Sequence, residues 1–353
     1  MGFPGDDDIV GPVTADLRGH RAPWMLFNQR GVALLVVLWI FVFLLVVAFD
    51  FATSVREEAR AAHRYSDETQ GYFLALAGFE RGAYELLQQS AGRETLDEQE
   101  RVDIFDGNWR EEVVEGGGIF RVRWVDEAGK INLNRADEET LRRVFTNIGI
   151  REPVRSILVD SIMDWRDPDD LHRVSGAENE YYRSLTPSYT AKNGSFDSVE
   201  ELLWIRGMTP ELFFGYADTH RQGDEDRGSV PLREIFTVDS PIDRVNLRTA
   251  SAEVIHALIG MPLEKSRAFV DERKKLSEKT LTDLLPLLGM GAENAMLQQF
   301  VFANPAVVGV EAEGHPVQSE ISRRVRGVVR VAGGGRDFEL VRWIDREIAS
   351  PAR

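Results

Sequence analysis

The sequence contains no cysteine, which excludes several classes of chemistry at once. Without a thiol the chain has no disulfide framework, no thiolate metal site and no cysteine nucleophile. It also lacks a nucleophile elbow, an HExxH zinc motif and a dinucleotide-binding fingerprint. The six histidines are scattered along the chain. These absences predict a protein that is not an enzyme.

Positive charge is scarce as well. The 353 residues include 58 acidic side chains but only 42 lysines and arginines, for a formal net charge of −16. A protein built to hold nucleic acid needs basic groups for the phosphates, so the composition argues against nucleic-acid binding. The chain is also too long for one ordinary core, which predicts two domains or a nested pair.

A long apolar run stands near the N-terminus. Residues Val32 to Phe49 are eighteen in a row without a charge. At about 1.5 Å per helical residue they span roughly 27 Å, close to the hydrocarbon thickness of a bilayer. We therefore predict a transmembrane helix at 32–49. Basic residues before it, Arg18, Arg21 and Arg30, predict a cytoplasmic N-terminus, with the chain beyond residue 50 on the other side of the membrane.

The segment that follows, residues 50–92, has a helical pattern. Apolar side chains recur there every three or four positions, at Tyr72, Leu76, Phe79, Ala83 and Leu87. We expect this helix to continue the membrane helix as a pilin-like rod and to offer the apolar stripe to partner helices as a shared seam. An alternative is that the stripe packs in the chain's own core. Glycines at 71, 78 and 82 weaken a helix and predict a possible bend.

Both ends of the globular part read as β-structure. Alternating runs flank a glycine triplet at 116–118, and similar runs flank another at 333–335, which predicts two hairpins. We therefore expect an α+β fold in which residues 93–129 and 306–346 form one antiparallel sheet domain. Residues 130–304 form a helical domain inserted into it, and residues 1–31 are a leader or cytoplasmic tail.

The inserted region contains an internal repeat. Residues 130–145 resemble residues 244–258, so that Asn132 corresponds to Asn246 at a separation of 114. Each copy leads to a Gly-Met turn, which predicts duplicated helix–hairpin–helix or SAM-like units at 130–215 and 244–304. Asp197 and Thr280 stand where helix N-caps belong, with Glu200 completing a capping box. Because such units can bind DNA, a membrane-anchored DNA receptor is the alternative function, although only "LGMG" (288–291) has both glycines.

An acidic insertion, residues 164–195, interrupts the first copy only. Hard oxygen ligands on an irregular turn suit Ca²⁺, and His172 is the one nitrogen ligand nearby, which argues against zinc. The alternative is a solvated acidic loop. The candidate calcium ligands are Asp164, Asp167, Asp169, Asp170 and Glu178.

Together these segments resemble the general secretion pathway protein K family, a minor pseudopilin of the type II secretion system. The resemblance covers nearly everything after residue 28. It rests on "QRGVALLVVLWI", "DEAGKINLN", "DWRDPDD" with "GAENEYY", "SVEELLWIRGM" and "VNLRTA", which occur in the order typical of the family.

The resemblance implies processing by a prepilin peptidase after Gly31, which leaves Val32 as an N-methylated first residue. Mature position five is then Val36, where most pilin-like subunits have glutamate. A subunit without that glutamate suits the filament tip, because nothing above it offers the amine that the glutamate would meet. A bulky helical head is also hard to stack repeatedly along a filament.

The expected function is therefore a non-enzymatic cap on the pseudopilus of the type II secretion system, which exports folded proteins across the outer membrane. The protein would cross the bacterial inner membrane once, with its C-terminal domain in the periplasm. Its partners would be the minor pseudopilins I and J, with structural calcium in the acidic region. No nucleic acid would be bound.

Overall fold

The computed structural model describes residues 29–91, 104–215, 230–275, 285–289, 295–317 and 319–345. The chain divides into two units, Met1–His63 and the head unit, Arg64–Arg353, and each is described by itself. The predicted tail up to residue 28, the cap at Thr280 and the glycine at 291 lie outside the described residues.

The first unit contributes the start of helix α1 (Gln29–Ser90). Every residue from Val32 to Phe49 is exposed, including Trp39 at 71% and Phe43 at 66%. The helix has a mean hydropathy of 3.3 over its most apolar window, and it is the one helix among the described residues that is long and apolar enough to cross a bilayer. Helical structure satisfies the backbone hydrogen bonds internally, which a segment surrounded by lipid requires.

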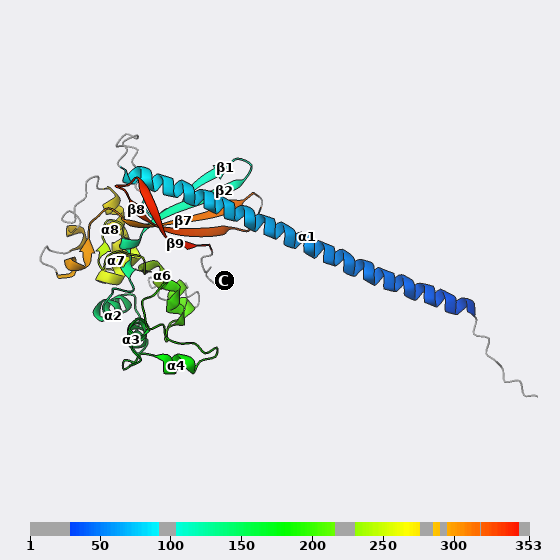
Figure 1. The fold of residues 1–353 in the computed structure, drawn as a ribbon, viewed down its shortest axis with the longest axis horizontal. Coiled ribbons are helices and arrows are strands. Elements are labelled where there is room, and N and C mark those ends of the chain that lie inside the picture. Colours follow the sequence, from blue (N-terminus) through cyan, green and yellow to red (C-terminus); the bar gives the residue numbers. More distant parts are fainter. Residues whose placement is uncertain are drawn as a thin grey trace, which may run out of the picture. The chain divides into compact units, whose positions relative to one another are not determined.

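The head unit contains a five-stranded antiparallel sheet in the order β1-β2-β7-β8-β9 (Figure 1). Its strands are β1 (Arg110–Val114), β2 (Gly118–Asp126), β7 (Val307–Pro316), β8 (Arg323–Ala332) and β9 (Asp337–Ile344). The antiparallel sheet predicted from the two ends of the globular part is thus confirmed. The central strand β7 was not identified from the sequence, because its two glycines and its acids obscure the alternation.

The α1 residues of the head unit cover one face of this sheet. Phe79 and Ala83 are buried with Val122 and Val310 from strands β2 and β7. Trp124 donates its indole N–H to the carbonyl oxygen of Gly82 at 2.9 Å. The apolar stripe is therefore part of the chain's own core, and the prediction that it forms a free seam for partner helices is wrong at its central positions.

Glycines let the helix approach the sheet closely. A Cβ on Gly82 would lie 2.6 Å from Cγ2 of Val122 and 2.8 Å from Cγ1 of Val310, and a Cβ on Gly78 would lie 2.9 Å from Cδ2 of Phe120. Helix α1 passes through all three glycines without interruption. These positions therefore serve packing against the sheet, which the sequence alone did not indicate.

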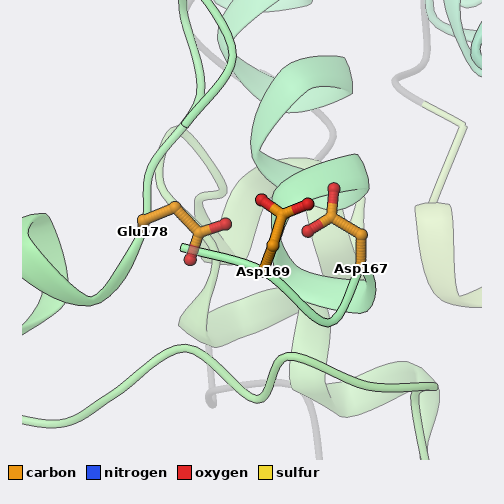
Figure 2. Close-up of side chains that lie close together, drawn as sticks. All are labelled: Asp167, Asp169 and Glu178. Atoms are coloured by element: carbon orange, nitrogen blue, oxygen red, sulfur yellow. The ribbon is translucent and has the colours of Figure 1, made fainter. Parts of the chain in front are cut away.

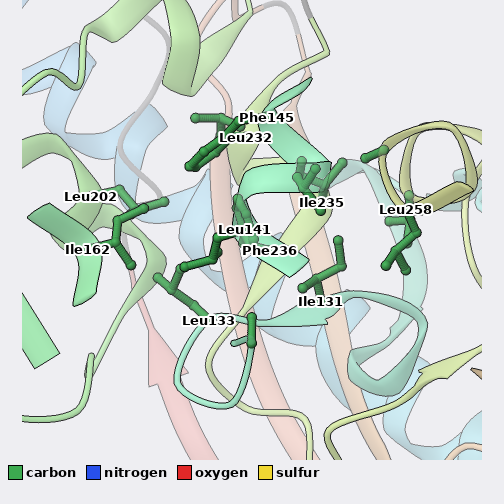
Figure 3. Close-up of a cluster of buried hydrophobic side chains, with 14 of the residues drawn as sticks. Ile131, Leu133, Leu141, Phe145, Ile162, Leu202, Leu232, Ile235, Phe236 and Leu258 are labelled. Atoms are coloured by element: carbon green, nitrogen blue, oxygen red, sulfur yellow. The ribbon is translucent and has the colours of Figure 1, made fainter. Parts of the chain in front are cut away.

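Between β2 and β7 lies the inserted region, built from short elements around one core (Figure 3). The first half contains η2 (Glu127–Gly129), β3 (Ile131–Asn132), α2 (Glu138–Asn147), α3 (Val154–Arg166), α4 (Asn179–Arg183), η3 (Val199–Trp204), α5 (Pro210–Phe214), α6 (Leu232–Ile235) and β4 (Phe236–Thr237). The second half contains β5 (Val245–Asn246), α7 (Ala252–Ile259), α8 (Leu263–Lys275), η4 (Pro286–Leu288), η5 (Ala295–Gln299) and β6 (Phe300–Val301).

The two repeat segments have the same local structure. Strand β3 pairs in parallel with β4, and β5 pairs in parallel with β6. In each copy the asparagine side chain, Asn132 or Asn246, accepts a hydrogen bond from the backbone N–H two residues later. Asp137 and Ser251, also separated by 114 residues, are the N-caps of α2 and α7.

An arginine pair completes the duplication. Arg166 of α3 donates to the carbonyls of Leu133 and Ala136 at 2.7 and 2.6 Å, and Arg273 of α8 donates to those of Leu247 and Ala250 at 2.7 and 2.8 Å. The arginines are 107 residues apart, whereas the loops they bind are 114 apart, so sequence comparison at a constant offset did not reveal the pair.

The predicted capping box lies one residue later than expected. Ser198, not Asp197, is the N-cap of η3. The carboxylate of Glu201, not that of Glu200, accepts the backbone N–H groups of Asp197 and Ser198 at 2.7 and 3.2 Å. Lys192, nine residues earlier, also donates to Glu201 at 2.8 Å. This contact favours Glu201 over its neighbour Glu200 as the capping side chain.

Buried charges join the sheet to the inserted region. Glu127, fully buried at the end of β2, accepts hydrogen bonds from Arg326 of β8 at 2.6 Å and Thr237 of β4 at 2.5 Å. Burial alone would raise the pKa of Glu311, but the guanidinium groups of Arg123 and Arg326 lower that pKa to about 2. A buried carboxylate is tolerated only with such partners, so this network holds the joint in one arrangement.

We predict that Gly82→Ala destabilises the head unit. Alanine favours a helix by about 1 kcal/mol over glycine, but overpacking against Val122 and Val310 costs roughly 1–3 kcal/mol, so the free energy of unfolding falls. Equilibrium urea denaturation of residues 64–353 measures this free energy of unfolding. In a Val122→Ala background one of the two close contacts is removed, so the penalty shrinks. An equal penalty in both backgrounds contradicts the packing role.

Candidate metal centre

Three of the five predicted ligands come together at the end of α3. One carboxylate oxygen from each of Asp167, Asp169 and Glu178 lies within 4.8 Å of the others. Their side chains point toward one another across the acidic loop (Figure 2). Asp167 and Asp169 follow the last turn of α3, and Glu178 precedes α4, so the loop between the two helices brings the group together.

Glu178 is the most unusual member of the group. It is only 4% exposed, and neither of its carboxylate oxygens has a hydrogen-bond partner. Oδ1 of Asp167 is likewise buried and unpartnered. Burial, together with the negative charges of Asp164 and Asp167, raises the pKa of Glu178 to about 7. Unpaired buried oxygens are expensive in free energy, and a cation would supply the missing partner.

Asp164 has a different role from the one expected of it. It is fully buried, and its two oxygens accept the backbone N–H of Arg173 at 3.2 and 3.1 Å. Burial raises its pKa to about 6. The loop passes so close that a Cβ on Gly176 would lie within 1.9 Å of Oδ2 of Asp164. Asp164 therefore shapes the loop from inside and lies outside the three-carboxylate group.

Asp170 also lies outside this group. Its Oδ1 accepts hydrogen bonds from the amide of Asn179 at 2.5 Å and from that of Asn193 at 3.1 Å. Asn193 also donates to the backbone carbonyl of Asp169 at 2.9 Å, and its own Oδ1 is buried and unpartnered. Asn193 thus holds the backbone of Asp169 and the side chain of Asp170 beside the site, a role that sequence reasoning missed. The sequence feature that could have indicated this residue is the dipeptide Asn193-Gly194. Asn before Gly favours the left-handed conformation, which Asn193 adopts at φ 48°.

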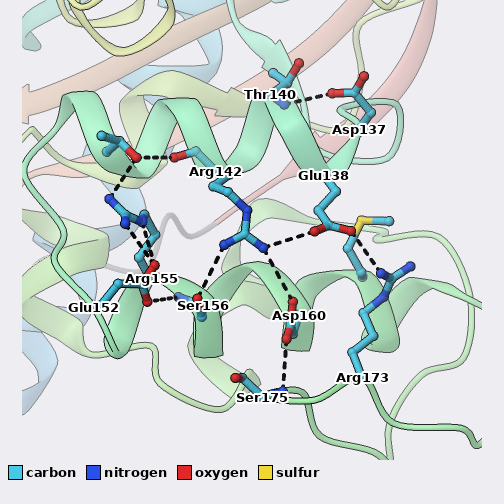
Figure 4. Close-up of polar contacts among 12 residues, drawn as sticks. Asp137, Glu138, Thr140, Arg142, Glu152, Arg155, Ser156, Asp160, Arg173 and Ser175 are labelled. Atoms are coloured by element: carbon cyan, nitrogen blue, oxygen red, sulfur yellow. Dashed lines mark hydrogen bonds and ion pairs between the residues drawn. The ribbon is translucent and has the colours of Figure 1, made fainter.

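A polar network holds the loop against α2 and α3 (Figure 4). Asp160 accepts the backbone N–H of Ser175 at 2.9 Å. Arg173 donates to Glu138 of α2 at 3.0 Å, and Arg142 donates to the other oxygen of Glu138 at 3.0 Å. The loop backbone is therefore placed by side chains from two helices, which fixes where the three carboxylates meet.

The donor chemistry of the site is that of a hard cation. The three carboxylates supply only oxygen ligands, which suit Ca²⁺. His172 is exposed, and its Nδ1 lies 3.0 Å from the carbonyl oxygen of Arg173. The residues present thus fit calcium better than zinc.

The remaining sequence predictions fall on other parts of the chain. Gly31 and Val32, the predicted processing site, lie near the start of α1. In the first Gly-Met turn, Gly207 has φ 85°, and a Cβ there would lie 2.8 Å from Cγ2 of Ile157. This glycine thus lets its turn pack on α3.

Comparison with known proteins finds similarity to one family. The family model for "Type II secretion system (T2SS), protein K" matches residues 119–216, which run from β2 through the acidic loop. The type II secretion system protein K of Pseudomonas aeruginosa is 27% identical over 260 residues, covering 70% of this chain and 73% of the relative. That of Klebsiella pneumoniae is 30% identical over 207 residues, covering 54% and 61%. Over these residues the chain is similar to the protein K family.

A solved structure supports the protein K fold. The GspK-GspI-GspJ complex from the enterotoxigenic Escherichia coli type 2 secretion system contains a chain that matches with a TM-score of 0.56 at 17% identity. The match covers 84% of this chain and 99% of the other. The fold of most of this chain is therefore shared with a chain of known structure.

We predict that Gly176→Ala disrupts the acidic loop. The added methyl collides with the buried Asp164 carboxylate, and overpacking of this kind lowers the free energy of unfolding by roughly 1–3 kcal/mol. Gly194→Ala is the matched control, because the nearest atom to its Cβ lies 3.8 Å away. Urea denaturation of both variants tests this, and equal stabilities would show that the loop accommodates a side chain at residue 176.

Proposed function

We propose that the chain is a member of the protein K family and a minor pseudopilin that caps the tip of the type II secretion pseudopilus, as a non-enzymatic structural subunit in the export of folded proteins across the outer membrane. The observation that carries the proposal is the large helical region inserted between adjacent strands β2 and β7. A helical region of this size beside helix α1 leaves little room for an identical subunit to stack above it.

The exposed apolar part of α1 supports a membrane-inserted precursor. Residues 32–49 cross the bacterial inner membrane once, with the N-terminus cytoplasmic and the head unit periplasmic. A prepilin peptidase cuts after Gly31 and leaves Val32 as the methylated first residue. Val36 then occupies mature position five, and a subunit at the tip needs no glutamate there because it has no predecessor.

We predict that the mature chain begins at Val32. Mass spectrometry of the protein purified from cells with the peptidase should find an N-methylated Val32 terminus, and cells without the peptidase should retain the leader. A mature chain that still begins near Met1, or a head unit found in the cytosol, contradicts the proposed export route.

The partners proposed for the tip are the minor pseudopilins I and J, which accompany the structurally similar chain in its complex. The opposite face of α1 is available for them. Phe73, Ala77 and Tyr84 are exposed there at helical spacing, Phe73 at 60% and Tyr84 at 55%. This face, rather than the buried stripe, would contact the partner helices.

Structural calcium is proposed at the group of Asp167, Asp169 and Glu178. Its support is the convergence of these three carboxylates and the unpartnered buried oxygens of Glu178. The ion would neutralise like charges that otherwise repel one another, and so hold the acidic loop. Asp164 and Asp170, also predicted as ligands, instead hold the loop backbone and its asparagines.

We predict that calcium stabilises the head unit and that chelation lowers its melting temperature. Free calcium at 100 times the dissociation constant contributes about 2.7 kcal/mol. Glu178→Gln should abolish the calcium-dependent shift, whereas Glu180→Gln, at an exposed acid in the first turn of α4, should keep it. Differential scanning calorimetry with calcium and with chelator measures the shifts. No shift in the wild-type protein would refute the site.

A further inference from the structure

The second repeat contains a groove between helix α8 and η4. The groove has a volume of about 610 Å³, which is within the range of ligand-binding pockets. Its lining is mostly apolar. Six of the residues that form it are Met261, Lys265, Ala268, Phe269, Glu272 and Leu287. We call this the repeat-2 groove.

Comparison of the two repeats shows that one face of α8 is unusually exposed. Arg166 and Arg273 bind equivalent carbonyl oxygens, so they align α3 with α8. On this alignment three groove residues of α8 correspond to three α3 residues that are buried. All three α8 residues are exposed in the described part of the chain. The pairs are Leu158 with Lys265, Ser161 with Ala268, and Trp165 with Glu272.

The Gly-Met turns of the two repeats differ in the same way. Gly207 lies against α3, where a Cβ would be 2.8 Å from Cγ2 of Ile157. A Cβ on its counterpart, Gly289, meets no described atom within 4 Å. Two residues before these glycines, Ile205 is 3% exposed, whereas Leu287 is 44% exposed. The turn of the second repeat therefore stands away from its helix, which leaves the groove between them.

A tyrosine fills the equivalent space in the first repeat. The ring of Tyr182 is fully buried and packs edge-on against Trp165 with the ring centroids 5.3 Å apart. Its hydroxyl accepts the backbone N–H of Arg206 at 3.4 Å. The counterparts of these two contact residues, Glu272 and Leu288, both line the repeat-2 groove. Tyr182 belongs to the acidic insertion, which interrupts the first copy only. The second repeat thus keeps the space for an aromatic ring without the insertion that supplies one.

We propose that the repeat-2 groove binds a separate protein chain that inserts one tyrosine or phenylalanine ring between α8 and η4. Phe269 lines the groove, and a second ring packed against it contributes more than its buried area alone. One aromatic anchor in a pocket is the typical centre of a protein interface. Lys265 and Glu272 lie two helical turns apart on α8, so polar groups flank the inserted ring on the partner. The inference is independent of the proposed cation site.

The probe for this site is N-acetyltyrosinamide, a tyrosine with a peptide group on each side. The full chain is placed in phospholipid nanodiscs through its own apolar helix, with isotope-labelled methionine methyl groups, and is titrated with the probe. The methyl signal of Met261, which lines the groove, is followed by NMR. We expect a saturable shift of this signal. N-acetylleucinamide should bind about three- to tenfold more weakly, because it lacks the ring.

Three variants locate the binding. Ala268→Trp fills the groove with a ring of the chain's own and should abolish the shift. Arg267→Trp adds the same ring at the neighbouring exposed residue, outside the groove lining, and should bind as the wild type does. Leu287→Ser removes apolar lining without adding bulk and should weaken binding about tenfold. Circular dichroism establishes that each variant is folded.

Each contrary outcome overturns the proposal. No saturable shift in the wild-type chain, equal binding of the two amides, or binding that persists in both Ala268→Trp and Leu287→Ser contradicts an aromatic site in the groove. Self-association of the wild-type chain is measured separately by sedimentation velocity. Self-association that is lost in Ala268→Trp but kept in Arg267→Trp assigns the groove to a second copy of this chain, and so overturns a separate partner.

Discussion

The pairing of β2 with β7 is the constraint on which the rest of the head unit depends. The two strands are neighbours in the sheet but are separated in sequence by the whole inserted region. Asp126 pairs with Val308 at the end of the ladder, so both ends of the insertion leave the sheet at one place. There Asp126 accepts hydrogen bonds from Asn246 and Thr249, while Glu127 binds Thr237 and Arg326. A single pair of acids thus contacts both halves of the inserted region.

This joint explains why the family motif at 126–134 combines charged and small residues. Asp126 and Glu127 are buried and must be satisfied, and Gly129 lies so close to the second repeat that a Cβ there would be 3.0 Å from Oγ1 of Thr249. Close approach also explains the glycines of α1, which let the helix pack directly against the sheet. Small residues and buried charges therefore mark where separate parts of the chain meet, rather than where the chain is weak.

The acidic loop divides its carboxylates between two tasks. Asp160 and Asp164 come from inside α3, where the helix fixes their positions, and they bind loop backbone N–H groups. Asp167, Asp169 and Glu178 come from the loop itself and converge, with both oxygens of Glu178 and Oδ1 of Asp167 left unpartnered. A rigid set of acids thus shapes the turn, and a second set is left available to a cation.

Local pattern in the sequence determined the features that depend on neighbouring residues: the apolar helix at 32–49, the hairpins around the glycine triplets and the antiparallel sheet. Composition also located the acidic insertion. Only the tertiary structure decided that the helical stripe packs on the sheet, that Glu201 rather than Glu200 caps η3, and which acids converge. The physical reason is that these outcomes are set by contacts between residues far apart in sequence, such as Gly82 with Val122 and Glu201 with Trp165, which a local sequence pattern does not predict.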